Sequence, residues 1–247
     1  MEQWSLRAQM DAALAEVEAF GFTSLIYDYS PVPRSHAGRL ITPTILETRN
    51  VPDGMVRLWR EDGMYQLDPV QDAALEVSAP FVWSYVGRQS DVMRRVLRDD
   101  HRPVVEYLRR SGLTFGVTVP IRAPDGALAT FTAIRMGADS SAIEPLVRRI
   151  PELGQLGHSF HDAVSPDFPA SARECPFCRL TKRERECLRL VGEGLTAKEI
   201  AYRLCRSEPT VVFHLNAAAR KLGARNRLQA VARAAHYRLL QDHFYHF

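Results

Sequence analysis

The fold of the C-terminal region is decided by residues 180–232, which read LTKRERECLRLVGEGLTAKEIAYRLCRSEPTVVFHLNAAARKLGARNRLQAVA. Two segments open with a capping box, 181–184 (TKRE) and 196–199 (TAKE), in which a threonine hydroxyl accepts a backbone N–H and a glutamate reaches back. Ser207 and Asn226 are suited to begin two further helices, because their side chains can accept the unpaired N–H groups of a first turn. The stretch therefore predicts an all-α domain of four short helices.

The third predicted helix carries the side chains that we expect to meet DNA. Its apolar residues, Val211, Leu215, Ala218 and Leu222, recur at helical spacing and are expected to face the core. The candidates for DNA contact on the other side are Thr210, Val212, Phe213, His214, Asn216 and Arg220. Asparagine can pair with adenine, arginine with guanine or phosphate, and phenylalanine with a thymine methyl. The alternative is that Phe213 supports the scaffold and Arg220 is only solvated.

The charges of the chain are distributed unevenly. Residues 179–247 hold 14 Lys and Arg against 6 Asp and Glu, a balance of +8, whereas residues 1–178 hold 18 against 23, a balance of −5. This asymmetry predicts two domains with different partners, of which the basic one is the candidate for phosphate contact.

With its caps, glycines and core positions in register, the quoted stretch resembles the LuxR-type helix-turn-helix nearly end to end. The resemblance implies a transcription regulator and not an enzyme. Because one helix-turn-helix covers a half-site, we expect a homodimer that reads an inverted repeat in promoter DNA. Val212 departs from the family, which usually has a basic residue there.

The rest of the chain predicts a second, mixed domain. We place a ligand-sensing domain at 1–165, a linker at 166–178 within a proline-containing segment, and the helix-turn-helix domain at 179–247. Helical spacing covers residues 9–20, 90–111 and 143–160, and β-rich runs cover residues 23–29, 115–121 and 127–135. The fold class is α/β (α+β), with an antiparallel sheet in an α/β/α sandwich that can enclose a small molecule.

No apolar run approaches the length of a membrane span, and the start of the chain does not resemble a secretory signal, so we expect a cytoplasmic protein that does not bind a membrane. The four cysteines are expected to be reduced. Cys175 and Cys178 form a C-x-x-C pair, but no second ligand pair follows at zinc spacing, so we predict neither a metal nor a cofactor.

Four features of residues 1–165 resemble the autoinducer-binding domain of quorum-sensing LuxR regulators. They are Asp68 before Pro69, Trp83, Gly116 and Thr118. The resemblance implies that Asp68 accepts a hydrogen bond from an amide N–H of the signal, since a buried carboxylate needs a donor. The alternative is that Asp68 only caps the turn before Pro69.

The departures from this family point to a different signal. Val51, Met55 and Trp59 stand where lactone receptors carry a Tyr-x-x-x-Trp-x-x-x-Tyr pattern, and methionine has no N–H for a lactone carbonyl. The Met and Trp pair resembles LuxR solos of plant-associated bacteria, which implies a small plant-derived amide or ethanolamine-like signal. The predicted ligand-binding residues are Asp68, Trp59, Met55, Trp83, Val51, Val70, Phe115, Thr118 and Thr132.

Three other interpretations stay open at this point. The first is an ordinary quorum sensor that responds to acyl-homoserine lactones through a repacked pocket. The second is an enzyme that uses His158, His161 and Asp162 as acid–base groups, without a nucleophile motif in support. The third is a module that only dimerises and binds no ligand.

Overall fold

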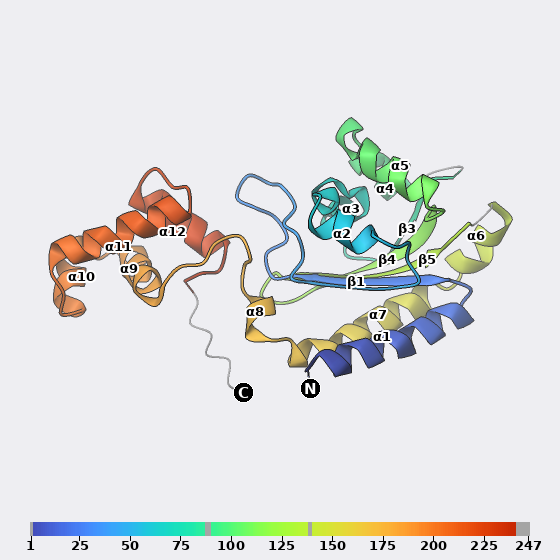
Figure 1. Ribbon diagram of the computed structural model, residues 1–247, viewed down its shortest axis with the longest axis horizontal. Helices are drawn as coiled ribbons and strands as arrows, with labels where there is room; N and C mark the ends of the chain where they lie inside the picture. Colours follow the sequence, from blue (N-terminus) through green and yellow to red (C-terminus); the bar gives the residue numbers. More distant parts are fainter. Residues whose placement is uncertain (1, 87–89, 138–139, 241–247) are drawn as a thin grey trace. The chain divides into compact units, whose positions relative to one another are not determined.

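The computed structural model describes residues 2–86, 90–137 and 140–240, and for residues 2–5 and 140–143 it describes only the backbone. The chain forms two units (Figure 1). The first consists of the residues up to Arg34 together with Gly38–Arg173, and the second of Ser35–Ala37 together with the residues from Glu174 on.

The first unit is built on an antiparallel sheet of five strands in the order β2-β1-β5-β4-β3. The strands are β1 (Ser24–Ser30), β2 (Ile45–Arg49), β3 (Phe81–Ser84), β4 (Phe115–Arg122) and β5 (Leu128–Arg135). The three predicted strands and the hairpin between the last two are confirmed. The two edge strands, β2 and β3, were not predicted, because they are only five and four residues long.

Helices cover both faces of this sheet, which confirms the α/β/α sandwich (Figure 1). One face packs against α1 (Glu2–Ala19) and α7 (Ile150–Val164). The other face carries α2 (Met55–Arg60), the 3-10 helix η1 (Met64–Leu67), α3 (Pro69–Glu76), α4 (Asp91–Val96) and α5 (Arg102–Arg110).

Alternation along the strands assigns each side chain to one face. On β1, β4 and β5 the odd-numbered residues, such as Tyr27, Phe115 and Phe131, belong to the apolar core under α1 and α7. The even-numbered residues, such as Ile26 and Ile134, pack toward the side of α2 and α3. The buried polar residues of the sheet are also at even positions on these strands, and this decides which side of the sheet can recognise a ligand.

Several helix boundaries differ from the sequence prediction. Helix α1 already begins at Glu2, and residues 90–111 form α4 and α5 with a 3-10 turn, Asp99–His101, between them. Residues 143–160 do not form one helix, because α6 (Ser140–Val147) ends before α7 begins with Pro151 in its first turn, where proline's missing N–H costs nothing. Helix α7 then continues to Val164, into the proline-containing segment. The predicted linker contains α8 (Ala170–Arg173), so this segment is more regular than its composition indicates.

The second unit consists of the four predicted helices, α9 (Lys182–Gly192), α10 (Ala197–Arg203), α11 (Glu208–Lys221) and α12 (Arg227–His236). Both capping boxes are present, and Ser207 and Asn226 cap α11 and α12 as expected. Glu184 also accepts a hydrogen bond from Lys221 Nζ at 2.7 Å, so one buried carboxylate joins the start of α9 to the end of α11.

Among the described residues, no helix combines the length and the apolar character needed to cross a bilayer. Within the same residues, no three His, Cys, Asp or Glu side chains gather as metal ligands. Cys175 and Cys178 are buried free thiols, and burial raises the pKa of both.

Candidate functional sites

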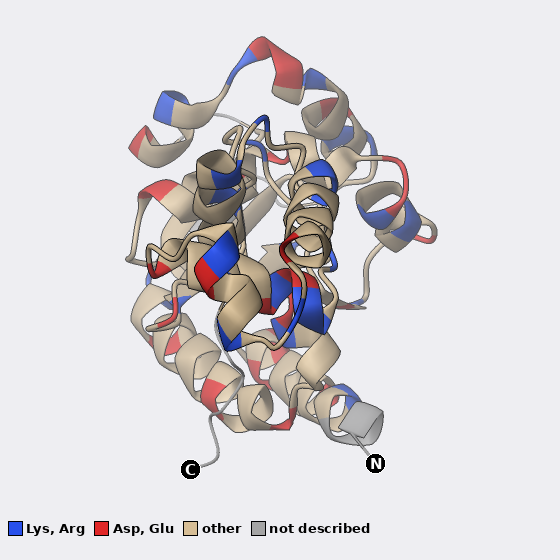
Figure 2. Cartoon of the chain, turned by 90° about the vertical axis from the view of Figure 1, so that its left-hand side faces the viewer, with Lys and Arg blue, Asp and Glu red and all other residues tan. Residues whose placement is uncertain are grey.

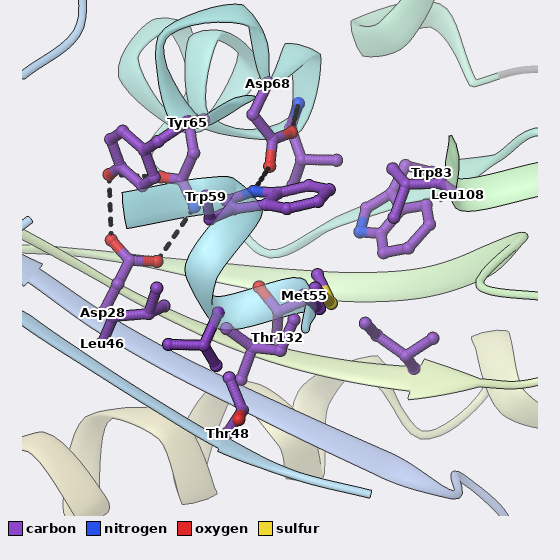
Figure 3. Close-up of a pocket in the computed structure, with 15 residues that line it drawn as sticks. Asp28, Leu46, Thr48, Met55, Trp59, Tyr65, Asp68, Trp83, Leu108 and Thr132 are labelled. Atoms are coloured by element: carbon purple, nitrogen blue, oxygen red, sulfur yellow. Dashed lines mark hydrogen bonds between the residues drawn. The ribbon is translucent and has the colours of Figure 1, made fainter. Parts of the chain in front are cut away.

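The first unit contains a cavity on the even-numbered face of its sheet, between β1, β2 and β5 and the helices α2, η1 and α3 (Figure 3). The cavity encloses about 520 Å³ of space outside the protein atoms, part of it continuous with solvent. Six of the predicted ligand-binding residues line it, namely Asp68, Trp59, Met55, Trp83, Val70 and Thr132.

Asp68 has two structural partners in this cavity. It is the N-cap of α3, where its Oδ1 accepts the backbone N–H of Val70 at 2.9 Å, so Asp68 does cap the helix that begins at Pro69. Its Oδ2 accepts the indole N–H of Trp59 at 2.8 Å (Figure 3). Burial raises the pKa of Asp68, while these two hydrogen bonds oppose the rise. Each carboxylate oxygen has two lone pairs, so Asp68 can still accept a bond from a ligand.

Met55 and Trp59 lie one turn apart on α2, and both are buried. Gly54 precedes them with φ +80°, a left-handed conformation that favours glycine at the start of this short helix. The Trp59 ring packs against Tyr107, with 5.4 Å between the ring centroids. The methionine therefore presents an apolar thioether to the cavity at the turn next to the Trp59–Asp68 bond.

Trp83 begins a chain of hydrogen bonds across the sheet. Its indole N–H donates to Thr118 Oγ1 at 3.0 Å, and the Thr118 and Thr132 hydroxyl oxygens are 2.9 Å apart. The ring fits because its register partner is Gly116, where an added Cβ would lie 2.3 Å from Trp83 Cζ2. The second indole N–H of the cavity is thus also bound to a protein acceptor.

Three predicted ligand-binding residues do not line the cavity. The prediction that Phe115 forms a wall of the cavity is wrong, because its odd position on β4 places it in the core against α1 and α7. Thr118 lies behind Thr132 and Trp83, and Val51 is half-buried at the edge of the helical side. The lining residues that were not predicted are Ile26, Asp28, Leu46, Thr48, Val56, Tyr65, Gln71, Leu108 and Ile134.

Asp28 is the most unusual of the residues that were missed. It is 1% exposed, and three side chains surround its carboxyl group. Oδ1 faces the Tyr65 hydroxyl at 3.1 Å (Figure 3). Oδ2 faces Gln71 Nε2 at 2.9 Å and the Thr130 hydroxyl. Burial raises the pKa of Asp28 to about 7, the hydrogen bonds oppose the rise, and the charge of Asp68 adds to it.

The proposed acid–base residues do not converge on a site. His161 is buried in α7, where its Nδ1 lies 2.7 Å from the Tyr27 hydroxyl among aromatic rings of the other core. His158 and Asp162 are exposed on the same helix. This geometry gives no support to an enzyme.

The second unit exposes the predicted DNA-facing side of α11. Val211, Leu215, Ala218 and Leu222 are buried as expected, while Val212, Phe213, Asn216 and Arg220 are exposed. Phe213 is 64% exposed, which argues against a scaffold role.

The remaining two candidates for DNA contact, Thr210 and His214, are less exposed. Thr210 and His214 are half-buried, and the Thr210 hydroxyl lies 2.7 Å from Ser207 Oγ at the N-cap. Among the described residues, Asn216 and Arg220 make no side-chain hydrogen bond or ion pair, so both are available to DNA. Lys and Arg are interspersed with Asp and Glu along the chain (Figure 2). The positive charge balance of residues 179–247 therefore does not come from one uninterrupted basic segment.

Comparison with known proteins identifies both domains. Residues 5–164 match the family profile of the autoinducer binding domain, and residues 179–234 match that of bacterial regulatory proteins of the luxR family. The regulator RpaR of Rhodopseudomonas palustris, named as HTH-type and quorum sensing-dependent, is 33% identical over 221 residues, which is 88% of this chain and 82% of RpaR. The transcriptional activator AhyR of Aeromonas hydrophila is 31% identical over 195 residues, 77% of this chain and 72% of AhyR.

Among solved structures, Escherichia coli SdiA has the same fold, with a TM-score of 0.55 at 22% identity over 96% of this chain and 92% of SdiA. The family consists of transcription regulators and not enzymes. This chain belongs to the LuxR family of ligand-binding transcriptional regulators, with an autoinducer binding domain followed by a LuxR-type DNA-binding domain.

Proposed function

We propose that this regulator is a LuxR solo whose cavity senses a small, plant-derived amide or ethanolamine-like signal and not an acyl-homoserine lactone. In this proposal the amide N–H of the signal donates to Asp68. Occupancy of the cavity then controls how the DNA-binding domain engages a promoter.

The observation that carries the proposal is that both indole N–H groups of the cavity are already bound to protein acceptors. Trp59 donates to Asp68, and Trp83 donates to Thr118. An indole N–H can donate only one hydrogen bond, and the thioether of Met55 has none to donate. A lactone carbonyl that enters the cavity would therefore lose its hydrogen bonds to water without gaining one from an indole. Such an unsatisfied buried acceptor costs about 1–3 kcal/mol of binding free energy.

On the DNA side, we propose that two copies of the chain read an inverted repeat through α11. Asn216 and Arg220 would contact bases and phosphates, and Val212 and Phe213 would pack against thymine methyl groups. The free side chains of Asn216 and Arg220 and the exposure of Phe213 support these roles.

Footprinting tests this arrangement. Two protected half-sites about one helical turn apart are expected, with weaker binding by the segment from residue 179 on. Protection of a single half-site by a stable monomer would contradict it.

The second candidate is a sensor of acyl-homoserine lactones. The observation in its favour is RpaR, whose name makes it quorum sensing-dependent and which aligns with 88% of this chain. Under this alternative, Asp68 would have the same role, and Trp59 or Trp83 would turn away from its present acceptor to reach the lactone.

Calorimetric titration of the full chain with two ligand panels separates the two candidates. One panel consists of N-acyl-homoserine lactones and the other of N-(2-hydroxyethyl)amides with matched acyl groups. We expect the hydroxyethyl amides to bind at least tenfold more tightly. Nanomolar binding of any lactone would replace the solo proposal with the quorum-sensor alternative.

A further inference from the structure

The described residues that line the cavity include two carboxyl groups, Asp28 and Asp68, and no Lys, Arg or His. Two basic groups on this side of the sheet, Arg98 and His101, are already held by Asp72, with contacts of 2.7 and 3.3 Å to its Oδ2. The charge of His101 also acts to lower the pKa of Asp68. A cationic ligand group would stabilise the ionised form of Asp28, because an unpaired buried charge is costly.

The hydrogen bonds around Asp28 fit a protonated carboxyl group in the cavity without a ligand. The Tyr65 hydroxyl has one hydrogen but two acceptors within reach, Asp28 Oδ1 at 3.1 Å and Gln71 Oε1 at 3.2 Å. Both contacts are satisfied when Asp28 is protonated and donates to Tyr65, which then donates to Gln71. Gln71 Nε2 donates back to Asp28 Oδ2, so the three side chains close a ring. The raised pKa of Asp28 is consistent with this neutral ring.

We propose that Asp28 is a second ligand anchor, and that the cavity takes a small ligand that carries an ammonium group a few bonds away from its amide N–H. This inference rests on the proposed function, because it uses Asp68 as the amide acceptor. The fold favours a short spacing between the ammonium group and the amide N–H. Asp68 is the N-cap of α3, and Gln71 lies in the first turn of the same helix, where it contacts Asp28.

The proton balance of binding follows from the ring. The ligand enters as an ammonium ion, Asp28 ionises, and its proton leaves to solvent. The Tyr65 hydrogen then points to Asp28 Oδ1, which frees Gln71 Oε1 to accept one N–H of the ammonium group. The ion is thus held by a carboxylate and an amide oxygen, and charge-assisted bonds of this kind are about twice as strong as neutral ones.

Two probes of equal size test the second anchor. N-butanoylethanolamine and N-(3-aminopropanoyl)ethanolamine differ only by a terminal methyl in place of an ammonium group. An apolar acyl subsite would favour the methyl probe, whereas Asp28 favours the ammonium probe. We expect the full chain to bind the ammonium probe at least tenfold more tightly.

The variant Asp28→Asn removes the ionisable group but keeps the ring, because its amide N–H replaces the proton that Asp28 donates to Tyr65. We expect it to lose the preference for the ammonium probe. Asp53→Asn, which removes a negative charge at an exposed position of the same unit, should retain the preference.

A second readout needs no variant. Titration of the native chain near pH 6 in two buffers of different ionisation enthalpy should show about one proton released with the ammonium probe and none with the methyl probe. The other titratable groups that face Asp28 are Tyr65 and Asp68, with Tyr27 next to it on the strand. The tyrosines stay neutral at this pH, and the methyl probe controls for Asp68.

Three outcomes would overturn the inference: no binding of the ammonium probe, equal or tighter binding of the methyl probe, or an unchanged preference in Asp28→Asn. Tight binding of the methyl probe would leave the proposed function standing without a second anchor. Binding of lactones and of neither probe would contradict both the proposed function and the second anchor.

Discussion

The indole N–H of Trp59 donates to Asp68 Oδ2 at 2.8 Å, and this bond fixes the carboxylate that we propose as the amide acceptor. Asp68→Asn keeps the volume but removes the charge, so both Trp59 and the ligand lose their strongest acceptor. Charge-assisted hydrogen bonds are worth about 1.5–3 kcal/mol, so affinity for the signal should fall roughly tenfold to a hundredfold. Calorimetric titration measures the change, and affinity within twofold of the native chain would exclude Asp68 as an anchor.

Restoring lactone donors should change the ligand preference. The double variant Met55→Trp and Trp59→Tyr supplies an indole N–H and a phenol at positions one turn apart on α2. We expect binding of acyl-homoserine lactones to strengthen by at least tenfold in a titration of the full chain. Met55→Trp alone serves as the control, because two indoles at these positions should overpack the site and lower stability by about 1–3 kcal/mol.

Base readout by α11 should depend on Asn216. Asn216→Ala is expected to relax the preference for one base pair in each half-site at a cost of about 1–3 kcal/mol, whereas Arg220→Ala should mainly reduce the salt dependence of binding. Selection of binding sites from a random DNA pool, repeated at two salt concentrations, distinguishes the two effects. A consensus unchanged by Asn216→Ala would remove this residue from base recognition.

The raised pKa of Asp28 predicts how stability depends on pH. The folded chain holds this proton up to a pKa of about 7, and the unfolded chain loses it near the ordinary value of 3.8. Between these values the folded state binds more protons, so the free energy of unfolding falls as the pH rises and is then constant above about pH 7. The total fall is up to about 4 kcal/mol.

Urea unfolding followed by tryptophan fluorescence checks this slope, because all three tryptophans, at positions 4, 59 and 83, lie in the first unit. Asp28→Asn should have a smaller slope between pH 4 and 7, and the difference between the two proteins isolates Asp28 from Asp68. Identical slopes would mean that Asp28 is already ionised in the folded chain.

Local sequence signals predicted the DNA-binding unit almost completely, since its caps and apolar positions lie within a few residues of each other. The cavity was only partly predictable, because it is assembled from distant segments. Asp28 and Gln71 are 43 positions apart and meet only after β1 and α3 are in place. Strand alternation does separate two of the predicted residues, because Phe115 and Thr118 differ in parity and cannot face the same side of a strand.

The same parity has a consequence for how this regulator can change over evolutionary time. Even-numbered positions of β1 and β5 form part of the sensing surface, whereas their odd-numbered neighbours hold the sheet to α1 and α7. Substitutions that retune the signal can therefore accumulate on alternate residues while the packing that keeps the domain folded is untouched. Insertion or deletion of one residue within these strands would instead exchange the two sets, so specificity should diverge by replacement and not by a change in strand length.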